Sequence, residues 1–167
     1  MCGLNHLSSA REQPGVPVQA HHRTNKTQQR RHPVRDMRFA KINVRVRDLD
    51  AAYAYTRDVL KAELLREKNN TPFGDMFLVR LGGLIIEVLA PDAPDSNLAK
   101  IIATRGEGID SIGYYVDDTA AAADALKGNG ARFSSVDERL AWVHPKNPLS
   151  LSIELMNSNL VKLVPED

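Results

Sequence analysis

The chain has 167 residues, of which 43% are hydrophobic, enough for one compact domain or for two small fused halves with a buried core. Its single cysteine, Cys2, excludes a disulfide framework and a zinc site built from cysteines, and it fits a reducing compartment, so we expect a cytoplasmic protein. No apolar run approaches the roughly 20 residues that span a bilayer, so we expect no membrane partner.

Residues 1–37 differ in composition from the rest of the chain. They carry six basic residues against two acidic ones, and they show no apolar period of 2 or 3.6 residues. Such a segment buries too little surface to offset its ordering entropy, so we predict a disordered N-terminal extension ahead of a domain over residues 38–167. The segment lacks the amphipathic helix of a transit peptide and the interleaved aromatic residues of a nucleic-acid arm, and we expect no nucleic-acid partner.

Polar and apolar residues alternate along the first predicted strand, residues 39–46. The apolar residues have to face a packed helix, so the polar residues have to face the opposite side of the sheet. The apolar set is Ile42, Val44 and Val46, and the polar set is Lys41, Asn43 and Arg45.

A helix is predicted next, because Asp48 is a good N-cap residue. An apolar stripe follows at helical spacing, formed by Ala52, Tyr55, Val59 and Leu60. Turn-forming residues then separate short β-rich runs. The remaining predicted elements of this half are a strand at residues 64–68, a loop at 69–75, and strands at 76–81 and 84–90 around the turn Gly82-Gly83.

A proline-containing link and a short linker helix, residues 95–106, separate this half from a second one. Ser96 is a suitable cap for that helix, and Gly106 is a suitable end. The second half is predicted to contain a strand at residues 109–116, a helix at 118–127, and strands at 132–136, 140–143 and 149–156.

The two halves share one pattern, a strand that ends at an aspartate before a run of alanines. Asp48 and Asp118 occupy matching places 70 residues apart, and Glu87 and Glu154 occupy matching places 67 residues apart. An internal repeat of this kind indicates two copies of one structural unit. We therefore predict an α+β fold in which two tandem βαβββ modules, residues 38–91 and 107–164, form a curved, mostly antiparallel sheet around a cleft.

These residues resemble the vicinal oxygen chelate superfamily, also known as the glyoxalase/bleomycin resistance/dioxygenase superfamily. Within it they are most similar to methylmalonyl-CoA epimerases, and the resemblance spans residues 39–157. The segments that carry it most specifically are Val46–Ala52, Tyr55–Leu60, Ile86–Pro91, Asp95–Lys100 and Arg105–Ile109.

The resemblance implies a divalent ion held by two histidines and by two carboxylate or amide ligands. That ion polarises a thioester carbonyl, so that the adjacent carbon can lose a proton to a carboxylate. The corresponding places in this chain are Lys41, Glu87, Ser111 and Glu154. The two glutamates are the only metal ligands left if a metal binds at all.

Both ligand histidines are therefore replaced. Of the five histidines, only His144 lies outside the N-terminal extension, in a loop where the resemblance gives it no ligand role. An ammonium and a hydroxyl are poor substitutes for the imidazoles that zinc and cobalt prefer, so we expect no cofactor; Co, Zn, Mn or Mg stays open as an alternative. The same loss argues against a ring-cleaving dioxygenase and against ordinary glyoxalase activity.

The candidate site residues follow from strand parity together with the resemblance. The catalytic candidates are Glu154, Lys41 and Glu67, and the substrate-binding candidates are Asn43, Ser111 and Tyr115. Each has a structural alternative: Lys41 is a surface charge if the first strand shifts by one residue, and Glu67 is a solvated charge if its loop leads it elsewhere.

The sequence thus predicts an isomerase or lyase that transfers a proton at a carbon acid, for instance an acyl-CoA thioester. A metal-free protein that sequesters a small molecule, and a homologue that serves only in assembly, remain as alternatives. For an enzyme or a binding protein, the expected partner is a small molecule. Because modules of different chains commonly pair in this superfamily, the resemblance also implies a homodimer.

Overall fold

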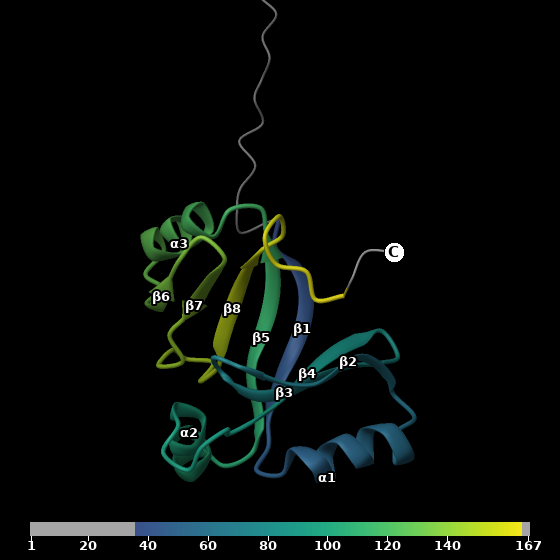
Figure 1. The fold of residues 1–167 in the computed structure, drawn as a ribbon. Helices are drawn as coiled ribbons and strands as arrows, with labels where there is room; N and C mark the ends of the chain where they lie inside the picture. Colours follow the sequence, from purple (N-terminus) through teal and green to yellow (C-terminus); the bar gives the residue numbers. More distant parts are fainter. Residues whose placement is uncertain (1–35, 165–167) are drawn as a thin grey trace, which may run out of the picture. The chain divides into compact units, whose positions relative to one another are not determined.

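The structure, a computed structural model, describes residues 36–164, and the same order of strand, helix and three strands occurs twice in them (Figure 1). The first half consists of β1 Arg38–Arg45, α1 Leu49–Ala54 with a wider π-helical turn η1 Tyr55–Val59, β2 Glu63–Thr71, β3 Gly74–Leu81 and β4 Leu84–Ala90. The second half consists of β5 Gly108–Val116, α3 Thr119–Gly128, β6 Phe133–Val136, β7 Leu140–Val143 and β8 Ser152–Asn157. Helix α2, Asn97–Arg105, lies between them in the chain.

All eight strands belong to one sheet with the order β2-β3-β4-β1-β5-β8-β7-β6. The two halves meet where β1 runs antiparallel to β5. Within each half the first and last strands pair in parallel, β1 with β4 and β5 with β8, and the other neighbours are antiparallel. The predicted α+β fold of two tandem βαβββ modules is confirmed.

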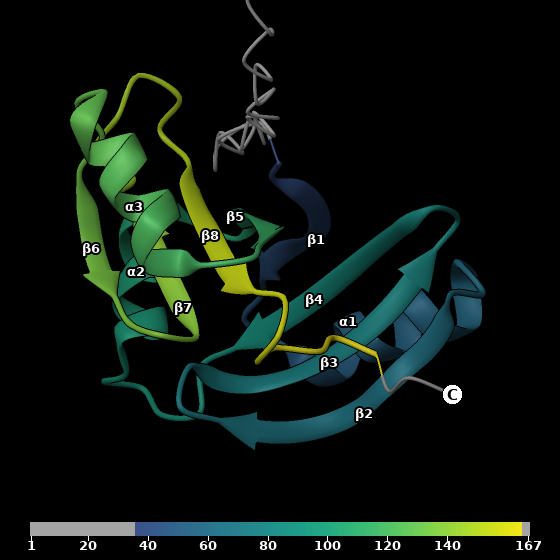
Figure 2. The same cartoon turned by 90° about the horizontal axis from the view of Figure 1, so that it is seen from above.

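The sheet bends strongly, so that strands far apart in its order come together. Strands β3 and β7 are five steps apart, which in a flat sheet would separate them by about 24 Å. Nevertheless, Phe73 at the turn between β2 and β3 lies with its ring centroid 6.2 Å from that of Trp142 on β7. The two modules therefore face each other across the concave side of the sheet, and Figure 2 shows this curvature of the strands from above.

Helices α1 and α3 cover the convex side of the sheet. Phe77, Val79 and Val88 form a core with α1, and Ala141 and Leu155 belong to the core beneath α3. Asp48 and Asp118 cap these helices as predicted, since each accepts a hydrogen bond of 2.9 Å from the backbone N–H three residues on.

The C-terminal segment after β8 passes over one end of the concave side of the sheet towards β2 and β3 (Figure 2). The N–H of Leu163 donates to the hydroxyl of Tyr115 on β5 at 3.1 Å, and Arg66 on β2 donates to the carbonyl of Leu163 at 3.2 Å. Leu163 is buried in a cluster with Ala40, Leu78 and Met156. At this end the cleft is therefore filled by the chain's own apolar side chains.

Three local predictions were wrong. The predicted loop at residues 69–75 is a tight hairpin turn between longer strands, because Asn70 donates to Asp75 across it at 2.9 Å. Tyr55 and Val59 are exposed, because the helix widens to π geometry at Tyr55. The helical residues that pack on the core include Leu49 and Tyr53 instead. The last strand begins at Ser152, after Ser150 takes a positive φ of 53°.

The predicted N-terminal extension lies outside the described residues except for Asp36 and Met37, and Met37 packs against the core beneath α3. Among residues 36–164, no helix has the length and apolar character required to cross a bilayer.

Candidate functional site

The polar side chains of β1 face the cleft. Lys41, Asn43 and Arg45 are only 4%, 1% and 7% exposed, although each carries a charge or an amide. The alternative in which Lys41 is a surface charge is therefore wrong. Buried polar groups require partners, and the partners of these three come from strands β4, β5 and β8 and from the turn before β5.

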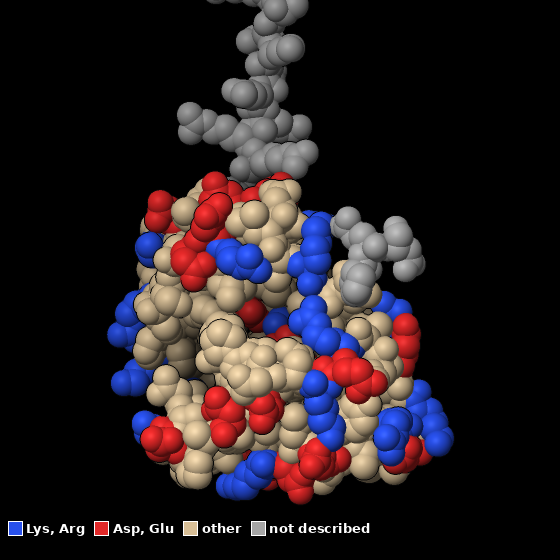
Figure 3. All heavy atoms as spheres, viewed as in Figure 1, with Lys and Arg blue, Asp and Glu red and all other residues tan. Residues whose placement is uncertain are grey.

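Lys41 lies between the two repeat-related glutamates. Its Nζ is 2.9 Å from Oε1 of Glu87 on β4 and 3.2 Å from Oε2 of Glu154 on β8. Figure 3 shows acidic and basic atoms together at the bottom of a hollow in this face of the protein. The ammonium of Lys41 thus forms an ion pair with a carboxylate from each module.

Each carboxylate also keeps one oxygen free. Oε2 of Glu87 and Oε1 of Glu154 have no hydrogen-bond partner among the described residues, and neither is a fully buried atom. The Glu87 side chain is 12% exposed and that of Glu154 only 4%, so the charged group is almost completely enclosed by protein.

Gly113 on β5 makes room for the lysine side chain. Lys41 and Gly113 are partners across β1 and β5, and Gly113 is also the partner of Glu154 across β5 and β8. A Cβ atom at position 113 would lie 2.9 Å from Cγ of Lys41 and 3.2 Å from Cε of Met156. The lysine stem can thus lie over β5 and reach the far glutamate only because residue 113 has no side chain.

Asn43 links the predicted substrate-binding residue Ser111 to Glu154. Its Nδ2 donates to Oγ of Ser111 at 2.6 Å and to Oε2 of Glu154 at 2.8 Å. Its Oδ1 is buried and has no partner among residues 36–164. Asn43 therefore holds the Glu154 carboxylate in place, and it retains one unsatisfied acceptor.

Burial raises the pKa of the Glu154 carboxyl above its ordinary value of 4.5. The charge of Lys41 and the hydrogen bond from Asn43 lower this pKa, and the charge of Glu87 raises it again. Two carboxylates face a single ammonium, so the group becomes electrically neutral when one carboxyl holds a proton.

Two sequence candidates lie apart from this group. Glu67 is exposed on the helix side of the sheet, where its carboxylate accepts a hydrogen bond of 2.9 Å from the hydroxyl of Tyr53 on α1. Its prediction as a catalytic residue of the cleft is not supported by this position. Tyr115 does lie on the cleft side, but its ring packs in the cluster with Leu163, and its hydroxyl accepts the N–H of that residue.

The side chains present do not fit a divalent metal ion. Among residues 36–164, no three side chains of His, Cys, Asp or Glu converge on one point. Lys41 brings a fixed positive charge to within 3.2 Å of both glutamates, where a metal would need a neutral or anionic donor. The ammonium and a divalent ion exclude each other by charge repulsion.

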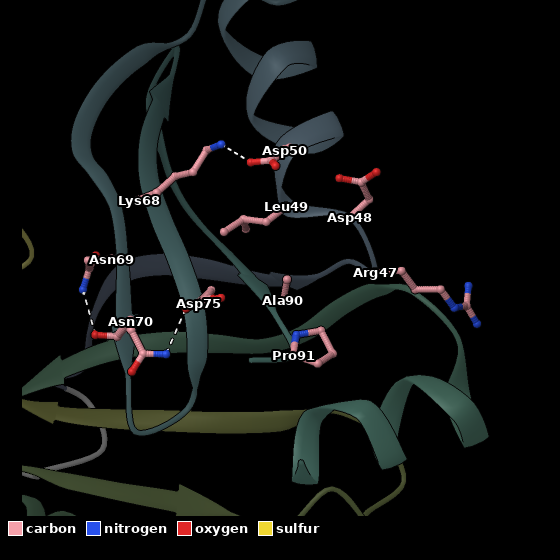
Figure 4. Close-up of a pocket in the computed structure, with 10 residues that line it drawn as sticks. All are labelled: Arg47, Asp48, Leu49, Asp50, Lys68, Asn69, Asn70, Asp75, Ala90 and Pro91. Atoms are coloured by element: carbon pink, nitrogen blue, oxygen red, sulfur yellow. Dashed lines mark hydrogen bonds and ion pairs between the residues drawn. The ribbon is translucent and has the colours of Figure 1, made fainter. Parts of the chain in front are cut away.

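A second hollow lies at the start of α1 and is separate from this group. It encloses about 540 Å³, and charged and amide side chains line it, as Figure 4 shows. None of the predicted site residues contributes to it. Its lining residues are Arg47, Asp48, Leu49, Asp50, Lys68, Asn69, Asn70, Asp75, Ala90 and Pro91.

Comparison with known proteins agrees with the fold. A family model described as the glyoxalase/bleomycin resistance protein/dioxygenase superfamily matches residues 40–157. The chain belongs to this superfamily. The resemblance noted in the sequence is confirmed at this level.

Several epimerases of the superfamily are similar to the chain. An ethylmalonyl-CoA/methylmalonyl-CoA epimerase of Cereibacter sphaeroides is 33% identical over 128 residues, which cover 75% of this chain and 96% of the relative. The structure of methylmalonyl-CoA epimerase from Mycobacterium tuberculosis is 28% identical, with a TM-score of 0.60, over 71% of this chain and 85% of that one. A methylmalonyl-CoA epimerase in complex with methylmalonyl-CoA and NH4+ is 21% identical, with a TM-score of 0.65, over 77% of this chain and 99% of that one.

Two residues of the cleft were not predicted. The sequence pattern assigns Gly113 only to a strand and gives Trp142 no role. Both act through neighbours on other strands, so their roles depend on the register between strands. The parity of β7 was the one available signal for Trp142, because it places that residue on the side opposite Ala141.

We predict that Gly113→Ala disturbs the charged group without changing its charges. The added methyl group overlaps the Lys41 stem, so we expect a loss of about 1–3 kcal/mol in the free energy of unfolding. Denaturant-induced unfolding measures this change in the free energy of unfolding. Gly128→Ala is the matched control, since nothing lies within 4 Å of its Cβ position, and an equal loss in both variants would contradict the proposed overlap.

We also predict a pH-dependent stability difference between the wild type and Glu154→Gln. A raised pKa means that the protonated carboxyl favours the folded state fully below pH 4.5, and that this contribution is lost as the pH rises through the raised pKa. The melting temperature of the Gln variant should therefore increase relative to the wild type across that range. Exposed Glu138→Gln should show no such trend, and a trend of opposite sign for Glu154→Gln would show that its pKa is lowered.

Proposed function

We propose that the chain transfers a proton at the carbon next to an activated carbonyl, as an epimerase does, with the Lys41 ammonium in the role that a divalent ion has in metal-dependent relatives. The observation that carries this proposal is the geometry of three groups. The Lys41 ammonium lies 2.9 Å from Glu87 and 3.2 Å from Glu154, so one cation and two acid–base groups stand together.

The acid and the base follow from the charge balance. Burial and the charge of Glu87 both raise the pKa of Glu154, so Glu154 is the better candidate for the acid of the pair. An epimerisation needs this pair, because one carboxylate removes the proton from carbon while an acid supplies one to the opposite face. Burial favours the protonated form of Glu154, which leaves Glu87 as the resting base in one direction, and the two roles exchange in the reverse direction.

In the proposed step the substrate carbonyl oxygen accepts an N–H of Lys41. The C–H bond breaks, its proton passes to the ionised carboxylate, and its electron pair moves to the carbonyl oxygen to form an enolate. The ammonium stabilises this oxyanion in a site with little water. The enolate then takes a proton from the other carboxyl on its opposite face.

The relatives support an acyl-CoA thioester as the substrate class. The 33% identical relative is named an epimerase of ethylmalonyl-CoA and methylmalonyl-CoA. One structure of the fold contains NH4+ together with methylmalonyl-CoA, and the Lys41 side chain ends in the same kind of cation. Methylmalonyl-CoA is accordingly the first substrate to test.

Exchange of deuterium from D2O into methylmalonyl-CoA tests the proposal. We expect exchange by the wild type and a loss of roughly a hundredfold in Lys41→Ala, because an oxyanion donor is removed. Glu154→Gln should lose epimerisation, because the enolate then has no proton donor on its second face, while exchange through Glu87 on the first face should continue. The exposed residues Lys100 and Glu138 provide matched control variants, Lys100→Ala and Glu138→Gln, which should keep full activity.

Full exchange in Lys41→Ala together with full epimerisation in Glu154→Gln would exclude this mechanism. Binding of the thioester without any exchange in the wild type would instead favour the alternative of a metal-free binding protein, in which Lys41 forms only a structural ion pair.

A further inference from the structure

An aromatic pair from the two modules stands beside the charged group. Trp142 on β7 is the partner of Glu154 across β7 and β8, so its side chain lies on the same side of the sheet as that carboxylate. Phe73 reaches it from the other module, with the two rings inclined at 52°. The pair therefore forms a wall of the cleft close to one of the two carboxyl groups.

The turn between β2 and β3 is built to hold Phe73 in this position. Oγ1 of Thr71 accepts the N–H of Phe73 at 3.2 Å and donates to the carbonyl of Gly74 at 2.8 Å. Gly74 has a φ of 127°, and a Cβ there would lie 2.4 Å from the carbonyl oxygen of Ala90. Only glycine lets the hairpin lie this close to the end of β4.

The aromatic pair still has unused contact surface. Phe73 is 56% exposed although its backbone is fixed, and Trp142 is only partly buried. The indole N–H of Trp142 has no hydrogen-bond partner among residues 36–164. The pair thus offers an apolar face and a solvent-accessible N–H donor on the side of the sheet that carries Glu154, and aromatic surface of this kind suits contact with a ligand.

We propose that Phe73 and Trp142 bind the apolar substituent on the acidic carbon and select substrates by its size. This inference rests on the proposed function, because it places the acidic carbon beside Glu154. A substituent on that carbon would contact Phe73 and Trp142. Each additional methylene would change the area of its contact with Phe73. The two residues are specificity determinants and take no part in the proton transfer.

Tryptophan fluorescence tests this assignment, because Trp142 is the single tryptophan of the chain. Methylmalonyl-CoA and ethylmalonyl-CoA are titrated into the full-length protein, and both should change the emission. Phe73→Ala should raise the Kd of ethylmalonyl-CoA about tenfold and that of methylmalonyl-CoA by less, because one methylene in an apolar site is worth about that factor. Phe39→Ala is the matched control, since Phe39 is 45% exposed and packs on Tyr114 on the convex side.

The outcomes separate this inference from the proposed function. Exchange that depends on Lys41, with no change in emission or with equal Kd values in Phe73→Ala and the wild type, would overturn the aromatic wall and leave the chemistry intact. Saturable emission changes that weaken in Phe73→Ala, without exchange, would support the wall and overturn the chemistry. Trp142→Phe keeps an aromatic ring, so it should retain the wild-type ratio of the exchange rate with ethylmalonyl-CoA to that with methylmalonyl-CoA. A fall of this ratio to the value found in Phe73→Ala would contradict a role based on contact with the ring.

Discussion

A buried ammonium between two carboxylates is the interaction on which the cleft depends. Taking three charges out of water costs several kcal/mol per ion, and their mutual attraction offsets this cost only when the geometry is close. Here Lys41 is within 3.2 Å of both Glu87 and Glu154, and Asn43 adds a hydrogen bond to the second of them. Strands β1, β4, β5 and β8 have to keep their registers for this contact, so the charged group also fixes how the two modules meet.

The same group limits the chemistry that the cleft can perform. A lysine carries one positive charge where a metal ion carries two, so it stabilises an enolate less strongly. The compensation lies in burial, because a low local dielectric strengthens the remaining interaction and moves the pKa of Glu154 toward the range useful for acid–base catalysis. We therefore expect slow turnover, or a substrate whose carbon acid is already activated.

Most of the site could be read from strand parity, and its exceptions have local causes. The alternation of polar and apolar residues around Lys41 and Asn43 was sufficient to predict that both side chains face the cleft, because β1 has a helix on one side and the cleft on the other. Glu67 lies on the helix side of the sheet because the pairing of β2 with β3 contains two irregularities. A change of register turns side chains to the opposite side of the sheet. The contact between Phe73 and Trp142 results from curvature of the whole sheet, which a local pattern does not encode.

Metal binding tests the central claim most directly. Co2+ binding is compared by equilibrium dialysis in the wild type, Glu154→Gln, Lys41→His/Ser111→His, and that double variant with Glu154→Gln added. Histidines elsewhere in the chain contribute equally to all four, so only differences matter. The double variant should bind one more equivalent than the wild type and lose it when Glu154 is replaced, and Glu154→Gln alone should bind as the wild type does. Loss of one Co2+ equivalent from the wild type on replacement of Glu154 would contradict the claim that Lys41 takes the cation's place.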